Sequence, residues 1–150
     1  MTPPGGRTSN RNSIITTELT IWARKDGTGL TFDSACLFRL PNGANRSPDA
    51  AWVRRERWDT LSAEEQEKAV PLCPDFVVEL MSPSDRLKMV QEKMDEYIAN
   101  GARLGFLIDP YEKRVHIYRQ GQPVQHLDQP LAVSGDPVLP GFVLNLTEMW

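Results

Sequence analysis

Short apolar runs alternate with turn-forming Gly, Pro, Asn and Asp residues along most of the chain. Residues 74–81 contain the clearest of these runs, and their β-branched and aromatic side chains predict a strand centred on residues 76–78. Residues 104–108 predict a second strand of the buried type. Residues 114–119 alternate between polar and apolar positions, which is typical of a strand with two different faces. These segments supply strands of the predicted sheet.

The N-terminal part of the chain predicts a helix. Within residues 10–25, Ile15, Leu19 and Trp22 follow the i, i+4, i+7 spacing of one helix face. Several threonines in the same stretch weaken its helix propensity. The polar, Gly- and Pro-rich residues 1–9 are expected to form a flexible lead-in.

A second helix and a hairpin are also expected. Ser and Asp side chains within residues 82–85 are typical of a helix start, and Asn-Gly at 100–101 is typical of its end. Residues 30–32 and 35–40 predict two strands of a β-hairpin joined near residues 33–34. The pattern therefore contains both helices and strands along its length.

The remaining segments complete a single α/β domain with a mixed sheet over residues 1–150. Residues 48–53 predict another strand. Residues 54–70 are rich in charge, and we favour a solvated connection there over a short helix at 61–65 opened by a Ser cap. The Pro-rich C-terminal part predicts short edge strands and loops.

Composition restricts the class of protein. No apolar run approaches the roughly 20 residues of a membrane span, and the N-terminus has no hydrophobic signal segment. Two cysteines, Cys36 and Cys73, are too few for a disulfide framework, so that a cytoplasmic protein with no membrane partner is expected. The net charge of −3 argues against a sequence-independent nucleic-acid coat protein, but not against a nuclease whose acidic site binds a cation.

Two carboxylates are the leading candidates for chemistry. Glu79 lies inside the most apolar strand, where a carboxylate is costly unless it is paired or binds a metal. Asp49, at the start of another predicted strand, is the best partner for it. Such a pair, completed by carbonyl oxygens and water, suits Mg²⁺ or Mn²⁺. The alternatives are an ion pair between Glu79 and an Arg, and an Asx turn formed by Asp49 after Pro48.

Lys93 is the third candidate, and the histidines are poor ones. Helix spacing places Val90, Met94 and Tyr97 around Lys93, so that its ammonium group either extends to solvent or points at a buried carboxylate or phosphate. The residues around His116 and His126 show no spacing typical of a zinc site. The chain also lacks a Gly-rich phosphate loop and the GxSxG motif.

Five short sequence motifs, in this order, resemble those of the Uma-two family, a bacterial group of restriction-endonuclease-like proteins. The resemblance covers residues from about Gly5 to the C-terminus. The motifs are SPDAAWV at 47–53, PDFVVELMSPSD at 74–85, KMDEY at 93–97, LIDP at 107–110 and LPGF at 139–142. Each is weak alone, and their order and spacing make the resemblance strong.

The resemblance implies a PD-(D/E)XK nuclease fold and a metal-dependent endonuclease that cleaves DNA. In that superfamily an aspartate and the acid of an ExK motif on the next strand bind the metal, and Asp49 and Glu79 match these two positions. The backbone carbonyl of Leu80 would be a third ligand. The lysine of ExK is replaced by Met81, which departs from the superfamily pattern.

In this family the lysine is expected on the following helix. There Lys93 and Tyr97 form a KxxxY that resembles the QxxxY of related nucleases. Lys93 would stabilise charge on the phosphate or orient the attacking water, and Tyr97 would support Lys93 or touch the substrate. The family also carries a further helix and strand before the segment that begins here, and these could supply another ligand.

Three functions stay open from the sequence. The leading one is a Mg²⁺- or Mn²⁺-dependent endonuclease acting on DNA. The second is a nuclease fold without catalysis that binds nucleic acid or protein, which the low basic charge favours. The third is a structural homodimer with no nucleic-acid role, and dimerisation itself is expected only by analogy with related nucleases.

Overall fold

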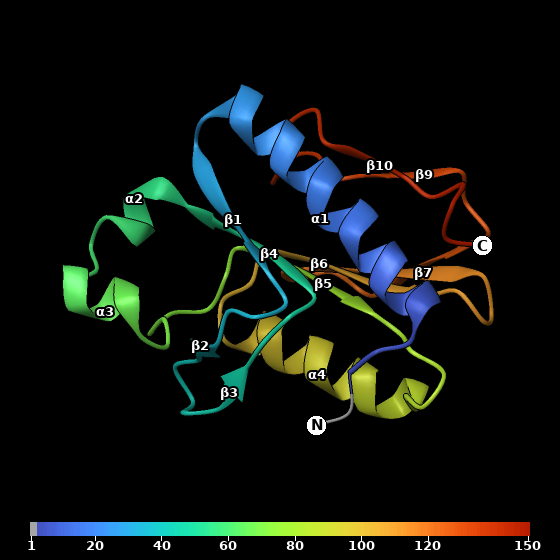
Figure 1. Ribbon diagram of the computed structural model, residues 1–150, viewed down its shortest axis with the longest axis horizontal. Helices are drawn as coiled ribbons and strands as arrows, with labels where there is room; N and C mark the ends of the chain where they lie inside the picture. The colour runs from blue at the N-terminus through green and yellow to red at the C-terminus, as the bar shows by residue number, and fades with distance from the viewer. Residues whose placement is uncertain (1–2) are drawn as a thin grey trace.

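The computed structural model describes residues 3–150, and these residues form three layers around one sheet (Figure 1). The central sheet has six strands in the order β1-β4-β5-β6-β7-β8. All neighbouring strands are antiparallel except β5 and β6, so the sheet is mixed as predicted. Its strands are β1 (Gly29–Asp33), β4 (Ala50–Arg54), β5 (Phe76–Leu80), β6 (Leu104–Asp109), β7 (Arg114–Arg119) and β8 (Gln125–Asp128).

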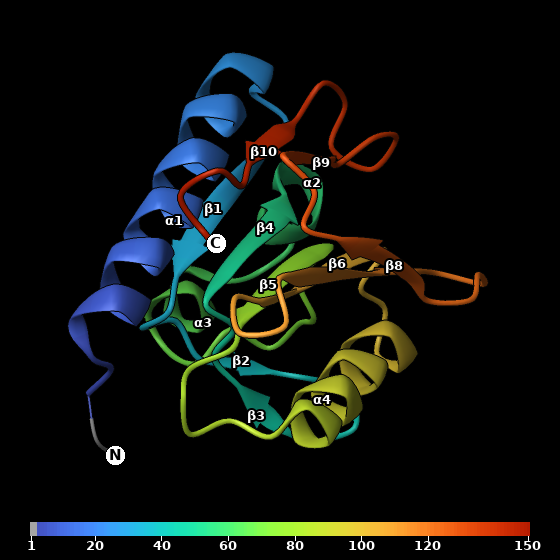
Figure 2. The same ribbon diagram turned by 90° about the vertical axis from the view of Figure 1, so that its right-hand side faces the viewer.

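Helices and two small ribbons cover the two faces of this sheet. In Figure 2, α1 and the β9–β10 ribbon lie on one side and α4 lies on the other. The remaining elements are α1 (Gly6–Asp26), β2 (Phe38–Arg39), β3 (Asn45–Arg46), α2 (Arg55–Trp58), α3 (Ala63–Glu67), α4 (Leu87–Ala99), β9 (Ala132–Ser134) and β10 (Val143–Asn145). None of the helices in residues 3–150 is long and apolar enough to cross a membrane.

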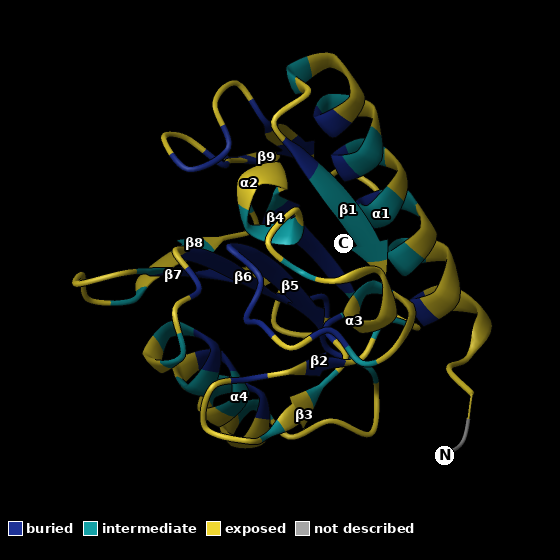
Figure 3. Ribbon diagram, turned by 90° about the vertical axis from the view of Figure 1, so that its left-hand side faces the viewer, coloured by how far each residue is buried: buried dark blue, intermediate teal, exposed yellow. Residues whose placement is uncertain are grey.

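The sheet separates two apolar clusters because successive strand residues point to opposite faces. One cluster joins α1, through Ile15 and Leu19, to β10 through Leu144. The other joins α4, through Met94 and Tyr97, to its face of the sheet. Figure 3 shows the central strands buried, while the outer surface of α1 is largely exposed.

Helix α1 begins earlier than the sequence indicates. It starts at Gly6 instead of residue 10, so the lead-in expected over residues 1–9 is shorter, and residues 1–2 lie outside the described part. Its end agrees with the predicted stop, because Gly27 takes the left-handed conformation (φ 78°) and donates its N–H to the carbonyl of Ala23. Burial of Ile15 and Leu19 outweighs the weak propensity of the threonines.

The predicted hairpin over residues 30–40 is wrong. Strand β1 pairs with β4, and β2 pairs with β3 across the turn at residues 41–43. Sequence neighbours were expected to pair, but β1 instead completes the sheet edge beside the buried β4. The favoured solvated connection is also corrected, since α2 and α3 form there and Ser62 caps α3 in a complete capping box with Glu65.

The start of α4 differs from the prediction as well. Asp85 accepts hydrogen bonds from the backbone N–H and hydroxyl of Ser82, at 2.8 and 3.0 Å, and closes a local turn. The helix itself begins at Leu87. It packs closely on β6 because Gly105 has no side chain: a Cβ built there would lie 2.5 Å from Cε of Met94.

Candidate active site

Asp49 and Glu79 come together at the end of the β4–β5 pair. The antiparallel register aligns Ala50 with Val78, so that Asp49 and Glu79 occupy the next opposed positions. Directly opposed residues in such pairs have Cβ atoms about 4.5–5.5 Å apart. The side chain of Asp49 turns toward β5, where its Oδ2 accepts the N–H of Leu80 at 2.7 Å.

Glu79 is buried between the sheet and α4, and both of its oxygens have partners from that helix. The hydroxyl of Tyr97 donates to Oε2 at 2.8 Å, and the ammonium of Lys93 lies 3.4 Å from Oε1. Glu79 is 6% exposed and Tyr97 is fully buried, whereas the side chain of Lys93 is 34% exposed. Lys93 therefore points at a buried carboxylate while it keeps contact with solvent, and the ion pair of Glu79 is with this lysine and not with the Arg of the alternative interpretation.

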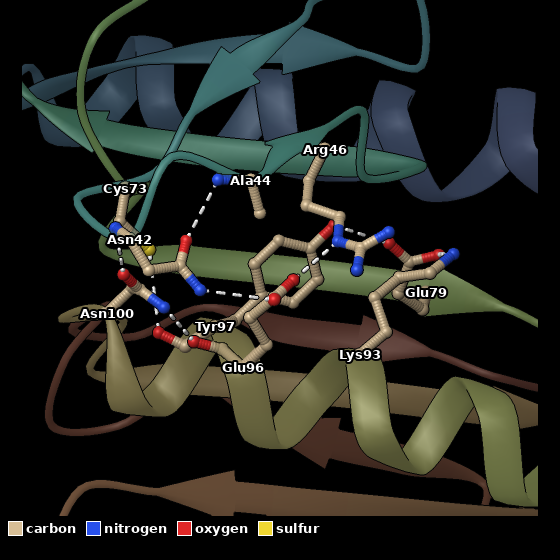
Figure 4. A network of polar contacts seen from close by, with 9 residues as sticks. All are labelled: Asn42, Ala44, Arg46, Cys73, Glu79, Lys93, Glu96, Tyr97 and Asn100. Atoms are coloured by element: carbon tan, nitrogen blue, oxygen red, sulfur yellow. Dashed lines mark hydrogen bonds and ion pairs between the residues drawn. The ribbon is translucent and has the colours of Figure 1, made fainter.

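The spacing of α4 explains why these groups meet. Lys93 and Tyr97 are four residues apart and lie on one face of the helix, with the buried Val90 and Met94 beside them. Strand β5 turns alternate residues toward α4, and Glu79 is one of these. In Figure 4 the side chains of Lys93 and Tyr97 rise from α4 toward Glu79.

The cationic groups near the two carboxylates do not offset the cost of burying negative charge there. Burial and the neighbouring charge of Asp49 raise the pKa of Glu79 from 4.5 to about 7, although Lys93 and Tyr97 act in the opposite direction. Burial likewise raises the pKa of Asp49, against the hydrogen bond from Leu80 and the charge of Lys93. Two buried carboxylates with raised pKa values are a usual mark of a functional site.

A second polar network adjoins this group. Glu96 pairs with Arg46 of β3, whose Nε lies 2.5 Å from Oε1, and accepts a hydrogen bond from Asn42 at 3.2 Å. Figure 4 shows Arg46 above α4, between Glu96 and Glu79. Sequence patterns did not indicate this network, because β3 and α4 are about fifty residues apart and only tertiary contact joins them.

Helix α1 also contributes to the site. Burial raises the pKa of Asp49, and a hydrogen bond from the side chain of Asn12 acts in the opposite direction by favouring the charged form. Asn12 and Asp49 line one hollow of about 340 Å³, and Arg46 and Lys93 line another of about 470 Å³. Asp49 is thus reached from the first hollow, and the ammonium of Lys93 from the second.

The donor set fits a hard divalent cation. Mg²⁺ is normally bound through one or two carboxylates together with water and substrate phosphate oxygens, and Asp49 with Glu79 matches that pattern. Within residues 3–150 no group of three His, Cys, Asp or Glu side chains converges on one point. Asp49 and Glu79 are two side chains that could hold such an ion together with water and substrate.

The fold is thus an α/β protein with a mixed sheet, and a buried acid–lysine–tyrosine cluster lies at the end of the β4–β5 pair. A crystal structure of a protein from Anabaena variabilis described as a "putative nuclease" has the same fold, with a TM-score of 0.80. Their sequences are 22% identical, and the match covers 99% of this chain and 82% of that one. Five chains of solved structures match in all, whereas no curated protein does.

The family follows from the sequence itself. The chain belongs to the Uma-two family, described as "Putative restriction endonuclease", whose family model matches residues 1–147. The family resemblance predicted from the short sequence motifs is thereby confirmed. The predicted α/β fold with a mixed sheet is confirmed as well.

Proposed function

We propose that this protein is a Mg²⁺- or Mn²⁺-dependent endonuclease that hydrolyses phosphodiester bonds of DNA. The observation that carries the proposal is the buried, opposed pair Asp49–Glu79, whose pKa values are raised mainly by burial and, for Glu79, also by the charge of Asp49. Membership of the restriction-endonuclease family supports the reaction class. The ion, when bound, would lower the pKa of a coordinated water and neutralise charge on the phosphate.

The backbone of Leu80 is proposed as a third ligand. In an extended strand the N–H and C=O of one residue point toward the same neighbouring strand. The N–H of Leu80 points at Asp49, with 2.7 Å between nitrogen and Oδ2. Its carbonyl therefore faces the edge of the sheet on which the Asp49 carboxylate lies, where a cation would be held.

Lys93 is proposed as the group that touches substrate. Its ammonium is held next to Glu79 but is one-third exposed, so it can donate to a phosphate oxygen or to the attacking water. Arg46 and Arg86 line the hollow on the same side, together with the acidic Asp85, Glu92 and Glu96. With Lys93 the three basic side chains balance the three acidic ones. A bound cation would therefore give this hollow the positive potential that a phosphate requires.

Tyr97 is proposed as a positioning residue. Its hydroxyl is buried and donates to Oε2 of Glu79, which keeps the carboxylate turned toward Asp49 and Lys93. Because the ring has no exposed surface, support of the acid fits better than direct contact with substrate. The KxxxY spacing then keeps both groups on one face of α4.

The decisive experiment is cleavage of supercoiled, linear and single-stranded DNA with Mg²⁺ or Mn²⁺. The parent chain is compared with Asp49→Ala and Glu79→Ala, and Glu64→Ala on α3 is the matched control because it removes an exposed carboxylate paired with Lys68. We expect both site variants to lose cleavage and metal affinity while they stay folded, and the control to keep both. Unchanged metal affinity in both site variants would refute the proposal.

One observation favours a second function, a nuclease fold that binds nucleic acid or protein without catalysis. Both oxygens of Glu79 already have protein partners, and Met81 stands where the superfamily has its lysine. On this alternative, DNA binding would be indifferent to Glu79→Ala and to EDTA. Absence of cleavage by the folded parent chain, with such binding retained, would select it.

Location and assembly complete the proposal. We place the protein in the cytoplasm, since Cys36 and Cys73 are both free thiols. A homodimer, proposed by analogy with related nucleases, would bring two such sites to one duplex. Sedimentation of the protein with and without DNA tests this, and a monomer under both conditions would contradict it.

A further inference from the structure

Strands β7 and β8 bring the two histidines of the chain into direct contact. The antiparallel register places His116 opposite His126. Their Nδ1 atoms are 2.8 Å apart, and the two rings meet edge to face with centroids 4.7 Å apart. The residues are ten positions apart, and the pairing of the two strands makes them one cluster.

The contact fixes the chemical state of the pair. Two ring nitrogens at this distance share one hydrogen, so one neutral ring donates and the other accepts. His116 is buried, and its Nε2 has no hydrogen-bond partner among the described residues. Burial and the charge of His126 lower the pKa of His116, which keeps that ring neutral near pH 7. His126 is exposed, so solvent reaches the pair from that side.

We propose that His116 and His126 form a bidentate site for Cu²⁺ or Ni²⁺, separate from the carboxylate site. Neutral imidazole nitrogen is a preferred ligand of these ions, whereas Mg²⁺ and Mn²⁺ prefer oxygen. For an ion to bind both Nδ1 atoms, the donating ring changes tautomer and its proton moves to Nε2, so that both rings stay neutral. The site needs no contribution from Asp49 or Glu79, so it is independent of the nuclease proposal.

The distance between the two Nδ1 atoms can be compared with the distance that each metal coordination geometry requires. Two nitrogens at about 2.0–2.1 Å from an ion are about 2.9 Å apart when they meet at 90°, and about 3.3 Å apart at the tetrahedral angle. The observed 2.8 Å is the separation of a hydrogen-bonded pair, and it shows that the strands let the two nitrogens approach as closely as the first value requires. Adjacent positions at 90° belong to the tetragonal geometries of Cu²⁺ and Ni²⁺. His126 is exposed on the edge strand, so its ring can turn its lone pair toward the ion.

The surroundings leave the site accessible to a cation. Arg114, on the same face of β7, helps to lower the pKa of His116, although it is paired with Asp128, with 2.9 Å between its Nε and Oδ1. The carboxylate of Asp109 is near enough to favour positive charge at His116. In residues 3–150 no third His, Cys, Asp or Glu completes a cluster, so water would fill the remaining positions.

The test is a titration of the untagged protein with Cu²⁺ and with Ni²⁺, followed by calorimetry and, for Cu²⁺, by electron paramagnetic resonance. We expect one ion per chain with two nitrogen ligands. In His126→Ala the affinity should fall about tenfold or more, since even the loss of a supporting group outside the ligand shell costs 10–100-fold. His126 is exposed, so this variant should fold, and the neighbouring Gln125→Ala on β8 is the control.

The outcomes are distinct. Equal affinity in His126→Ala and the parent, or a single nitrogen in the parent spectrum, would overturn the inference. Ni²⁺ should also raise the melting temperature of the parent and of Glu79→Ala but not that of His126→Ala, because only the folded hairpin assembles both ligands. Retention of the effect in Glu79→Ala separates this site from the proposed nuclease centre, whatever the cleavage assays show.

Discussion

Replacement of Glu79 by Gln should stabilise the metal-free protein above neutral pH. The folded-state pKa of Glu79 is about 7, against 4.5 for the free side chain. Below pH 4.5 the carboxyl is protonated in both the folded and unfolded states, and no penalty arises. As the pH rises from 4.5 to about 7, the unfolded state loses its proton first and the folded state is progressively destabilised.

The difference between these two pKa values corresponds to about 3 kcal/mol at pH 8. Gln keeps the size of the side chain and can still accept from the hydroxyl of Tyr97, but it carries no charge to desolvate. Glu79→Gln should therefore be more stable than the parent by about 2–3 kcal/mol at pH 8, and equal to it at pH 4.5. For a chain of this length the gain corresponds to a rise in melting temperature of about 4–12 °C.

The assay is urea unfolding in EDTA at several values between pH 4.5 and 8, with parent and variant side by side. Only the difference between the two curves reports Glu79, because other groups titrate in the same range. The pKa of the buried His116, for example, is lowered, so its contribution to stability is lost as the pH falls. A variant no more stable than the parent at pH 8, or a difference that does not change with pH, would refute the reasoning.

Three further predictions follow from packing and hydrogen bonding. Tyr97→Phe removes a donor from a buried carboxylate, so it should raise the pKa of Glu79 and cost about 1.5–3 kcal/mol in urea unfolding at pH 8; an unchanged value would contradict the assigned contact. Gly105→Ala places a Cβ 2.5 Å from Cε of the fully buried Met94, so that this side chain must repack, and the variant should cost about 1–3 kcal/mol in urea unfolding. Ser62→Ala removes the cap of α3 and should cost about 1 kcal/mol in thermal unfolding without a change in Mn²⁺ affinity.

Local sequence patterns predicted where helices and strands form better than they predicted which strands pair. Strand β5 and helix α4 were identified because a long apolar run and a helical stripe are properties of contiguous residues. The pairing of β1 with β4 was missed, since β1 reaches its partner past the β2–β3 ribbon. The start of α4 was misplaced because Asp85 satisfies the backbone of Ser82 instead of capping the helix.

The candidate site divides in the same way. Asp49, Glu79 and Lys93 could be selected from sequence because each charge lies in or beside an apolar segment, and their proximity is a consequence of the β4–β5 register and the α4 spacing. Asn12 and Arg46 could not be selected, since neither lies in a pattern that distinguishes it from an ordinary surface residue. Their places at the site are set by how α1 and β3 pack.

The proposed ligands and the lysine come from β4, β5 and α4, which gives the site a particular dependence on the fold. The register of β4 with β5 opposes the two carboxylates, and the closeness of α4 to β6, which Gly105 permits, sets how far Lys93 and Tyr97 reach toward Glu79. A change in the β4–β5 register or in the position of α4 would also break the contacts of Glu79 with Lys93 and Tyr97. The uncompensated charge therefore persists in the metal-free protein, because strands and helix hold the carboxylates together before any cation arrives. Such preorganisation lowers stability above neutral pH, and it would favour cation binding because the ion meets carboxylates that are already in place.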